Sequence, residues 1–211
     1  MAELTTRDTK LIQYLNEAYG KERELETALQ AHIAMTTRRP YKKRLQEHLK
    51  ETKGHSRGLQ RRIKQLGGKA ETVPAAPGPV ADAAGAVTGA ASKAVAAAKG
   101  PLHVLRGTGE QEKMLKNAKT EYSEEHEEIA TYTAIETLAQ SVGDSETAKL
   151  ARGIRREEER MARFLERLIP TLTKAVTKDE IPVAERRSNG RRRRRRSSGS
   201  RSSASRSRAR S

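Results

Sequence analysis

The sequence contains no cysteine, no tryptophan and a single phenylalanine. The missing thiols exclude disulfide frameworks, thiolate zinc sites, cysteine-ligated iron–sulfur clusters and cysteine nucleophiles. With aromatic residues at only 3%, any core must be built mainly from leucine, isoleucine, valine, alanine and methionine. A chain without cysteine also suits a reducing compartment, so we expect the protein to be cytoplasmic.

Long hydrophobic segments are missing as well. Residues 1–10 lack the apolar stretch of a secretory signal. The longest weakly apolar run, residues 80–98, contains Asp82 and Lys93 and consists mostly of alanine. Alanine contributes too little transfer free energy to offset two charges in a bilayer, which argues against a membrane span.

Charge is abundant and unevenly distributed. The chain has 43 Lys and Arg against 27 Asp and Glu, a net charge of +16. Residues 186–211 hold 12 arginines and no acidic residue, so the rest of the chain has 31 basic against 27 acidic groups, a net charge of +4. We therefore expect one nearly neutral domain over residues 1–175, followed by a linker and a cationic tail over residues 176–211.

The pattern of apolar residues predicts an all-α protein. Sustained alternation typical of strands is absent, whereas apolar residues recur every three or four positions. Pro40 and Gly143 mark a helix start and a helix end, and Pro170 is expected to kink or fray the last helix. The four predicted helices cover residues 8–35, 40–66, 110–142 and 145–170.

The connection lengths predict how these helices pack. The first two helices are joined by a few residues, as are the last two, so each pair should form an antiparallel hairpin. Residues 67–108 form a long connection that can cross the length of the bundle, and its alanine-rich middle predicts a short helix. Short, long and short connections are typical of the ferritin-like four-helix bundle. An elongated coiled coil is the weaker alternative, because polar residues interrupt the apolar faces.

Acidic residues lie at the middle of every apolar face. Burying several carboxylates together is unfavourable unless cations neutralise them, and a pair of divalent metal ions does so. Carboxylate and imidazole ligands suit iron or manganese, and some four-helix bundles build di-iron centres from such residues. The inward-facing residues are Glu22 and Glu26, Glu51 and His55, Glu125 and Glu128, and Glu158.

Other acidic and histidine residues nearby are interpreted differently. Most of the 27 acidic residues should lie on solvated helix faces. We expect Glu157 to be among these, together with Glu47, Glu124 and Glu127. His48 lies on the same face as His55, but a hydrogen-bonded interior or edge histidine is the expected role for it.

Three segments resemble one known family. Residues 17–25, 47–55 and 125–132 are similar to the bacterial ferritin-like stress proteins called YciE/YciF-like, which long carried the label of a domain of unknown function. The resemblance covers residues 8–170 and implies a ferritin-like bundle, a homodimer, a candidate di-metal centre and a link to stress responses. It implies no defined reaction. The ligands it implies are Glu22, Glu51, His55, Glu125 or Glu128, and Glu158.

The resemblance also shows a departure from the family pattern. The family usually has an acidic residue four positions after its last glutamate ligand, and this chain has Ala162 there. Two functional interpretations follow. In the first, the bundle binds one or two iron or manganese ions, with Tyr19 and Tyr132 as hydrogen-bonding neighbours of the ligands. In the second, the bundle is a non-enzymatic scaffold without a metal, so the sequence leaves open whether the protein is an enzyme.

The cationic tail predicts a nucleic-acid partner. A segment of arginine, serine and glycine cannot bury enough apolar area to fold, and we expect it to be disordered. Arginine binds phosphate well, and without aromatic residues to stack on bases its contacts with nucleic acid should be non-specific. We therefore expect the protein to be associated with the nucleoid. Because the body carries only +4, we expect the tail to supply most DNA binding. The tail arginines are Arg186, Arg187, Arg191, Arg192, Arg193, Arg194, Arg195, Arg196, Arg201, Arg206, Arg208 and Arg210.

Overall fold

The computed structural model of the protein describes residues 4–71 and 109–186. Within these ranges the chain is helical and has no strand. The expected alanine-rich helix, and the tail after residue 186, lie outside the described residues. The helices are α1 (Thr6–Met35), α2 (Arg39–Gln65), α4 (Glu110–Ser141), α5 (Ser145–Glu180) and the short α6 (Val183–Arg186). The four predicted helices are thus confirmed, and three of them agree with the prediction to within two residues at each end.

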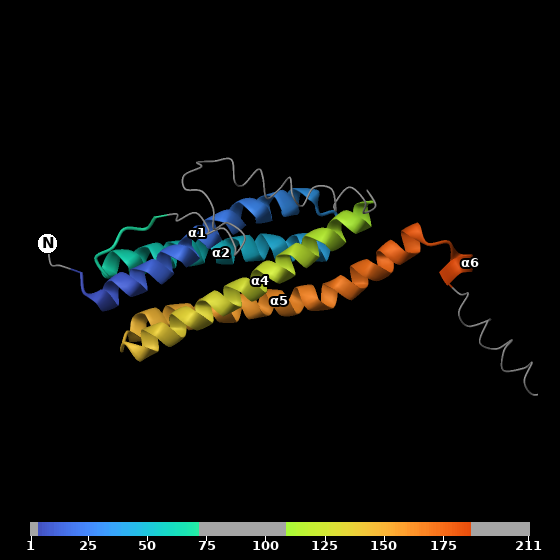
Figure 1. Ribbon diagram of the computed structural model, residues 1–211. Coiled ribbons are helices and arrows are strands. Elements are labelled where there is room, and N and C mark those ends of the chain that lie inside the picture. The colour runs from blue at the N-terminus through green and yellow to red at the C-terminus, as the bar shows by residue number, and fades with distance from the viewer. Residues whose placement is uncertain (1–3, 72–108, 187–211) are drawn as a thin grey trace, which may run out of the picture.

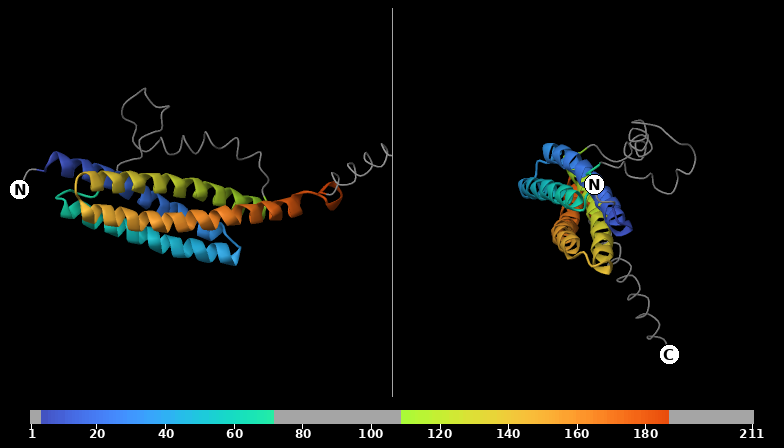
Figure 2. Two further views of the ribbon diagram at one scale, coloured as in Figure 1. Left: turned by 90° about the horizontal axis from the view of Figure 1, so that it is seen from below. Right: turned by 90° about the vertical axis from the view of Figure 1, so that its left-hand side faces the viewer.

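The long helices form a four-helix bundle (Figure 1). Helix α2 packs against α1 and α5, and α4 packs against the same two helices, so α2 and α4 lie diagonally across the bundle. The end view in Figure 2 shows the same arrangement. Each hairpin is antiparallel, as the short connections predict. No described helix is long and apolar enough to cross a membrane.

Local signals explain where the helices begin and end. The Thr5 hydroxyl accepts a hydrogen bond from the backbone N–H of Asp8 at 3.1 Å, which caps the start of α1. Gly143 has a φ of +73°, a left-handed conformation that ends α4. Pro170 does not end α5, which continues for ten more residues to Glu180 and curves over its last part (Figure 1).

The described core consists of three apolar clusters, and a polar layer lies between the two larger ones. One cluster includes Leu29, Tyr41 and Leu165, and the other includes Leu15 and Leu59, among others. Each of the four helices passes from one cluster to the other, and its buried acidic or histidine residues lie between the two. The packing on both sides therefore holds the polar layer at the middle of the bundle.

Asp144 is expected to stabilise the turn between α4 and α5 more than any other single residue there. Its side chain caps α5 by accepting from the backbone N–H of Thr147 at 3.0 Å, and it binds Arg62 Nη2 through both oxygens at 2.7 and 2.8 Å. Asp144→Ala removes the cap and leaves Arg62 with the exposed Glu146 as its main acidic partner. We expect a loss of about 2–4 kcal/mol in the free energy of unfolding, measured by chemical denaturation.

A matched variant separates the two contributions of this residue. Asp144→Asn keeps an oxygen that can cap the helix and removes the charge that pairs with Arg62, so its loss should be about half as large. A loss below about 0.5 kcal/mol for Asp144→Ala would contradict this assignment.

Candidate metal centre

Six of the buried acidic and histidine side chains of the polar layer make up or adjoin two groups of possible metal ligands. Helix α1 contributes one glutamate, α2 two histidines, α4 two glutamates and α5 one glutamate. All six have 5% or less of their surface exposed: Glu22, His48, His55, Glu125, Glu128 and Glu158. Charged groups are rarely buried at this density without a partner that neutralises them.

A first group of ligand atoms surrounds the Nδ1 atom of His55. This nitrogen lies 3.2 Å from Glu22 Oε1 and 3.0 Å from Glu158 Oε1. The three residues come from α2, α1 and α5. Each offers one atom, and all three atoms lie within 4.8 Å of one another, so a single ion between them can contact all three.

A second group surrounds the Nε2 atom of His48, two helical turns before His55. This nitrogen lies 2.9 Å from Glu125 Oε1 and 3.6 Å from Glu158 Oε2, and the three atoms again lie within 4.8 Å of one another. Glu158 therefore belongs to both groups and presents one oxygen to each histidine. If metal ions were bound, Glu158 would therefore be a ligand at both positions.

Several atoms of the centre lie within ion-pair distance of one another but take part in no hydrogen bond. His48 Nε2, His55 Nδ1 and both oxygens of Glu158 are buried without a hydrogen-bond partner in the described part of the chain. Both oxygens of Glu128 are in the same state. Buried polar atoms of a folded protein are almost always satisfied. Because the ligand atoms of each group lie within 4.8 Å of one another, metal cations bound among them would give these atoms partners.

Two outer carboxylates complete the surroundings of the histidines. The second nitrogen of His48, Nδ1, lies 3.1 Å from Glu51 Oε2, and that of His55, Nε2, lies 2.9 Å from Glu157 Oε2. Each imidazole thus has one nitrogen toward the centre and the other on a carboxylate. Metal-binding histidines usually have such a partner, which fixes the ring orientation and raises its basicity.

Without a metal, the histidines and Glu128 of the centre would hold protons strongly. Burial alone lowers the pKa of His55, but Glu158 and Glu22 outweigh it and raise the pKa to about 11. The pKa of His48 rises to about 10 in spite of burial, chiefly because of Glu125. Burial raises the pKa of Glu128 well above its usual value, and the neighbouring Glu22 and Glu158 charges raise it further.

The charges of the centre match two divalent cations. Four buried carboxylates, Glu22, Glu125, Glu128 and Glu158, carry four negative charges when ionised, equal to the charge of two such ions. Carboxylate oxygens with two imidazole nitrogens suit iron or manganese. In the general bundle pattern, two different helices each supply one histidine. Here α2 supplies both.

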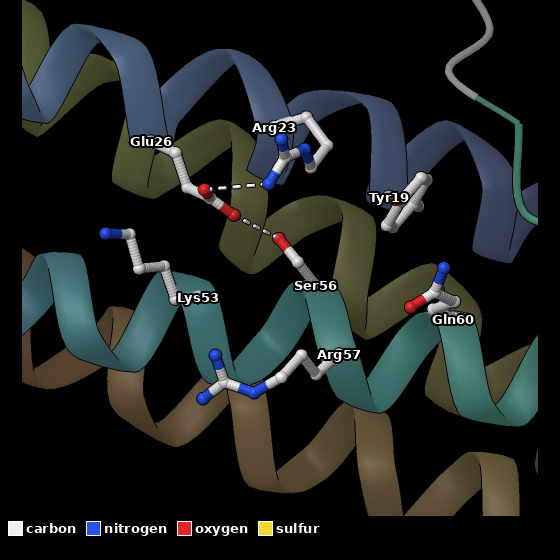
Figure 3. Close-up of a pocket in the computed structure, with 7 residues that line it drawn as sticks. All are labelled: Tyr19, Arg23, Glu26, Lys53, Ser56, Arg57 and Gln60. Carbon is white, nitrogen blue, oxygen red and sulfur yellow. Dashed lines mark hydrogen bonds and ion pairs between the residues drawn. The ribbon is translucent and has the colours of Figure 1, made fainter.

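The two tyrosines expected near the centre have different positions. The Tyr132 hydroxyl donates a hydrogen bond to Glu22 Oε1, which is the role expected for it. Tyr19 has no hydrogen bond to any candidate ligand among the described residues. It lines a groove between α1 and α2 together with Arg23 and Ser56 (Figure 3).

The structure gives a small solute a direct approach to one side of the centre. A hollow of about 440 Å³ between α2 and α5 is lined by His55 and Glu157, with Leu150, Gly153 and Ile154 on its wall. Glu157 is about one-third exposed, so it connects the buried imidazole with solvent. Glu157 belongs to neither group of ligand atoms and lies at the edge of the centre as a partly exposed partner of His55.

The positions of Glu51 and His48 differ from those expected from the sequence. Glu51 lies outside both groups. Glu51 is partly exposed, and its Oε2 atom lies 2.9 Å from Arg44 Nη2. Partial burial alone would raise its pKa, but His48 and Arg44 outweigh this effect and lower the pKa to about 2. His48, expected to be an ordinary interior histidine, belongs to the second group instead of Glu51. The equivalent of the family's missing carboxylate, Ala162, is buried nearby, and the second group forms without it.

Comparisons with known proteins place the chain in a family. A family model described as a domain of unknown function, DUF892, matches residues 6–178. The chain belongs to the DUF892 family. The resemblance to YciE/YciF-like proteins is thereby confirmed, and no curated protein is similar enough to match.

Solved structures of several bacterial proteins share the fold. A protein from Xanthomonas campestris pv. campestris is 25% identical, with a TM-score of 0.63 over 83% of this chain and 99% of that one. The Escherichia coli stress protein YciF is 20% identical, with a TM-score of 0.59 over 81% and 98%. Ferritin-like, diiron-carboxylate proteins from Bacillus anthracis reach a TM-score of 0.56 at 20% identity, over 78% and 99%. The bundle of this DUF892 protein is therefore ferritin-like.

Proposed function

We propose that this protein binds a pair of iron or manganese ions at the middle of its bundle. The observation that supports this best is Glu158, which presents one oxygen to the His55 group and the other to the His48 group. Glu22, which accepts a hydrogen bond from Tyr132, would complete the first position and Glu125 the second. Burial raises the pKa of Glu128, which is close enough to both positions for the charges of Glu22, Glu158 and Glu125 to raise it further. When bound, such ions supply redox chemistry toward oxygen or peroxide.

The protein's own residues have three tasks at this centre. The four carboxylates neutralise the ions, and the two histidines provide nitrogen ligands that discriminate against magnesium and calcium. Glu51 and Glu157 orient the imidazoles. The apolar clusters on both sides exclude bulk water, and the hollow at His55 leaves one approach for small solutes.

Metal analysis tests this proposal directly. Purified full-length protein, loaded with Fe²⁺ without oxygen or with Mn²⁺ and freed of loosely bound ions, should retain more than one ion per chain by elemental analysis. A ratio near zero after loading would refute metal binding. That result would favour the second interpretation, a non-enzymatic scaffold, for which the only specific observation is Ala162 in the place of an acidic residue.

We further propose that the protein is a cytoplasmic stress protein that associates with nucleic acid through its tail and forms a homodimer. The positive charge of the tail supports nucleic acid as a partner. Arg186, the one tail arginine in the described residues, donates hydrogen bonds to the carbonyls of Lys178 and Ile181 and so helps to end α5. The phosphate contacts should therefore come mainly from the arginines after it.

Neutralising the arginine run should reduce binding to DNA. When Arg191–Arg196 are all replaced by glutamine in the full chain, up to six phosphate contacts are lost. The slope of log K against log salt concentration should become shallower by up to about 5 units on duplex DNA. Metal content should not change, since the tail contributes no ligand to the centre. An unchanged slope would show that the tail does not bind DNA.

A further inference from the structure

The net charge of the body hides a strongly basic helix. Helix α2 has ten lysines and arginines against two glutamates, whereas α5 has nine against seven and α4 three against eight. The body's net charge of +4 is therefore an average over helices of very different charge. Helix α2 alone has a net charge of +8 (ten minus two), whereas α5 has +2 (nine minus seven) and α4 has −5 (three minus eight).

The structure also removes acidic groups from the surface. Seven acidic side chains of the described residues are buried in the bundle: Glu22, Glu26, Glu121, Glu125, Glu128, Asp144 and Glu158. Charges that are neutralised inside contribute little to the field outside. The surface of the body is therefore more positive than its composition indicates.

The cations of α2 form a straight line on its outer face. At 100° per residue, seven of them fall within an arc of about 80°, opposite the face that packs into the bundle. They extend over about 37 Å of helix at 1.5 Å per residue. We call this set the basic ridge: Arg39, Lys43, Lys50, Lys53, Arg57, Arg61 and Lys64.

The basic ridge is open and largely without acidic partners. Six of its seven residues are exposed, and Lys53 is partly exposed. Among the described residues, the only ion pair it makes joins Lys43 Nζ to Glu47 at 3.9 Å. Figure 3 shows Lys53 and Arg57 beside the groove between α1 and α2, with no carboxylate bound to either. These cations are free to bind an external anion.

We propose that the basic ridge binds the phosphate backbone of duplex DNA. A duplex is a stiff, straight polyanion with one charge per about 1.7 Å of its axis, so a rigid straight row of cations can follow it. Protein partners usually need apolar anchors at the middle of an interface. The large hydrophobic residues exposed in the described parts of the chain, Leu4, Met35, Ile181 and Val183, all lie outside α2.

The position of the tail agrees with this partner. Helix α6 lies beyond the end of the bundle at which α1 ends and α2 begins (Figures 1 and 2). The arginine-rich segment therefore continues from the same end as Arg39, the first residue of the ridge. A duplex on the ridge would pass near the end of the bundle at which α6 lies (Figures 1 and 2). The expectation that the tail supplies most DNA binding would then no longer hold.

The test compares two full-length triple variants that lose the same charge. Lys50→Gln, Arg57→Gln and Arg61→Gln remove three exposed cations of the ridge, none with an ion-pair partner in the described chain. Lys113→Gln, Lys116→Gln and Lys119→Gln remove three from α4, the helix diagonally opposite. The probe is a 30-base-pair duplex of random sequence, and affinity is measured between 0.05 and 0.3 M salt. Circular dichroism and metal content confirm that both variants fold.

The ridge variant should bind the duplex about 100-fold or more weakly at 0.1 M salt, with a slope of log K against log salt shallower by about 2.7 units. The α4 variant should lose less than about threefold. A charge-preserving variant, with Lys50→Arg, Arg57→Lys and Arg61→Lys, should bind like the unchanged protein. The metal centre and the tail arginines are intact in all three proteins, so failure of this inference is distinct from failure of the proposed function.

Two results would overturn the inference. Equal losses in the ridge and α4 variants would show that only net charge matters. Alternatively, the ridge variant could bind the duplex normally and fail to bind phosphatidylglycerol vesicles, which would assign the surface to an anionic membrane instead.

Discussion

Glu158→Gln should abolish metal binding at both positions of the centre. The amide has nearly the shape of the carboxylate but no charge, and it cannot bridge two cations. Because Glu158 lies 3.0 Å from His55 and 3.6 Å from His48, the loss affects both groups at once. Loss of a residue that only orients a ligand lowers metal affinity by about 10–100-fold. Glu158 is itself a proposed ligand, so each position should lose more than about 100-fold in affinity. Elemental analysis should show a fall from more than one ion per chain to nearly none.

Two comparisons make this result specific. Glu166→Gln changes an exposed glutamate of the same helix, without an ion pair in the described structure, and should leave the metal content unchanged. Glu51→Gln removes only the outer partner of His48, so it should weaken one position by about 10–100-fold and spare the other. If Glu158→Gln retains the full metal content while Glu51→Gln loses it, Glu51 is the ligand and Glu158 is not.

Metal binding should also raise the thermal stability of the protein by a large amount. An ion at 1,000 times its dissociation constant stabilises the folded state by about 4 kcal/mol if it binds only that state. For a chain of this size, such a stabilisation raises Tm by about 8–16 °C for each occupied position. Differential scanning calorimetry of the chelated protein, before and after Mn²⁺ is added, measures the shift.

The size of the shift should depend on pH. The pKa values of His48 and His55, about 10 and 11 without metal, are raised above those of an unfolded chain. The stability that these groups give the metal-free protein is full below pH 6.5 and is lost as the pH rises toward those values. Metal binding releases the protons and becomes stronger as pH rises. The gap in Tm between the two forms should therefore widen from pH 6 to pH 8.

Controls for the stability experiment use the same centre. Glu158→Gln should show almost no rise in Tm with Mn²⁺, and Mg²⁺ should give the unchanged protein a much smaller rise, because imidazole is a poor magnesium ligand. Equal shifts with Mg²⁺ and Mn²⁺ would point to non-specific binding of cations to surface carboxylates.

The helices and their order could be predicted from the sequence because each signal is local. Apolar spacing, Pro40 and Gly143 act within a few residues, and the connection lengths restrict how the helices pair. The end of the last helix differs, because α5 continues past residue 170 to Glu180. A proline disfavours a helix locally, but packing of Leu168 and Leu172 on both sides of it keeps α5 continuous.

The centre was only partly predictable, because a helical face defines which residues point inward and not how deep they lie. Glu51 and His48 are three residues apart on α2 and both face α4 and α5. Only the three-dimensional packing shows that the imidazole enters the centre while the carboxylate remains behind it, held by Arg44. His48 and His55 are seven residues apart, two turns, and this spacing could have indicated one histidine for each ion.

The charge of the body could not be judged from composition at all. The sum of +4 weights a buried carboxylate such as Glu128 and an exposed cation such as Lys50 equally. The structure separates them, since the first is enclosed at the centre and the second is open to solvent. Net charge is therefore a poor guide to the surface of a bundle that encloses its own acidic residues.

Anomalous X-ray scattering from crystals of the Mn²⁺-loaded protein measures the centre most directly. Two peaks are predicted in the middle of the bundle. One should lie within bonding distance of His55, Glu22 and Glu158, and the other within bonding distance of His48, Glu125 and Glu158. A crystal of fully loaded protein with no peak between these residues, or with peaks only on the surface, would contradict the metal centre.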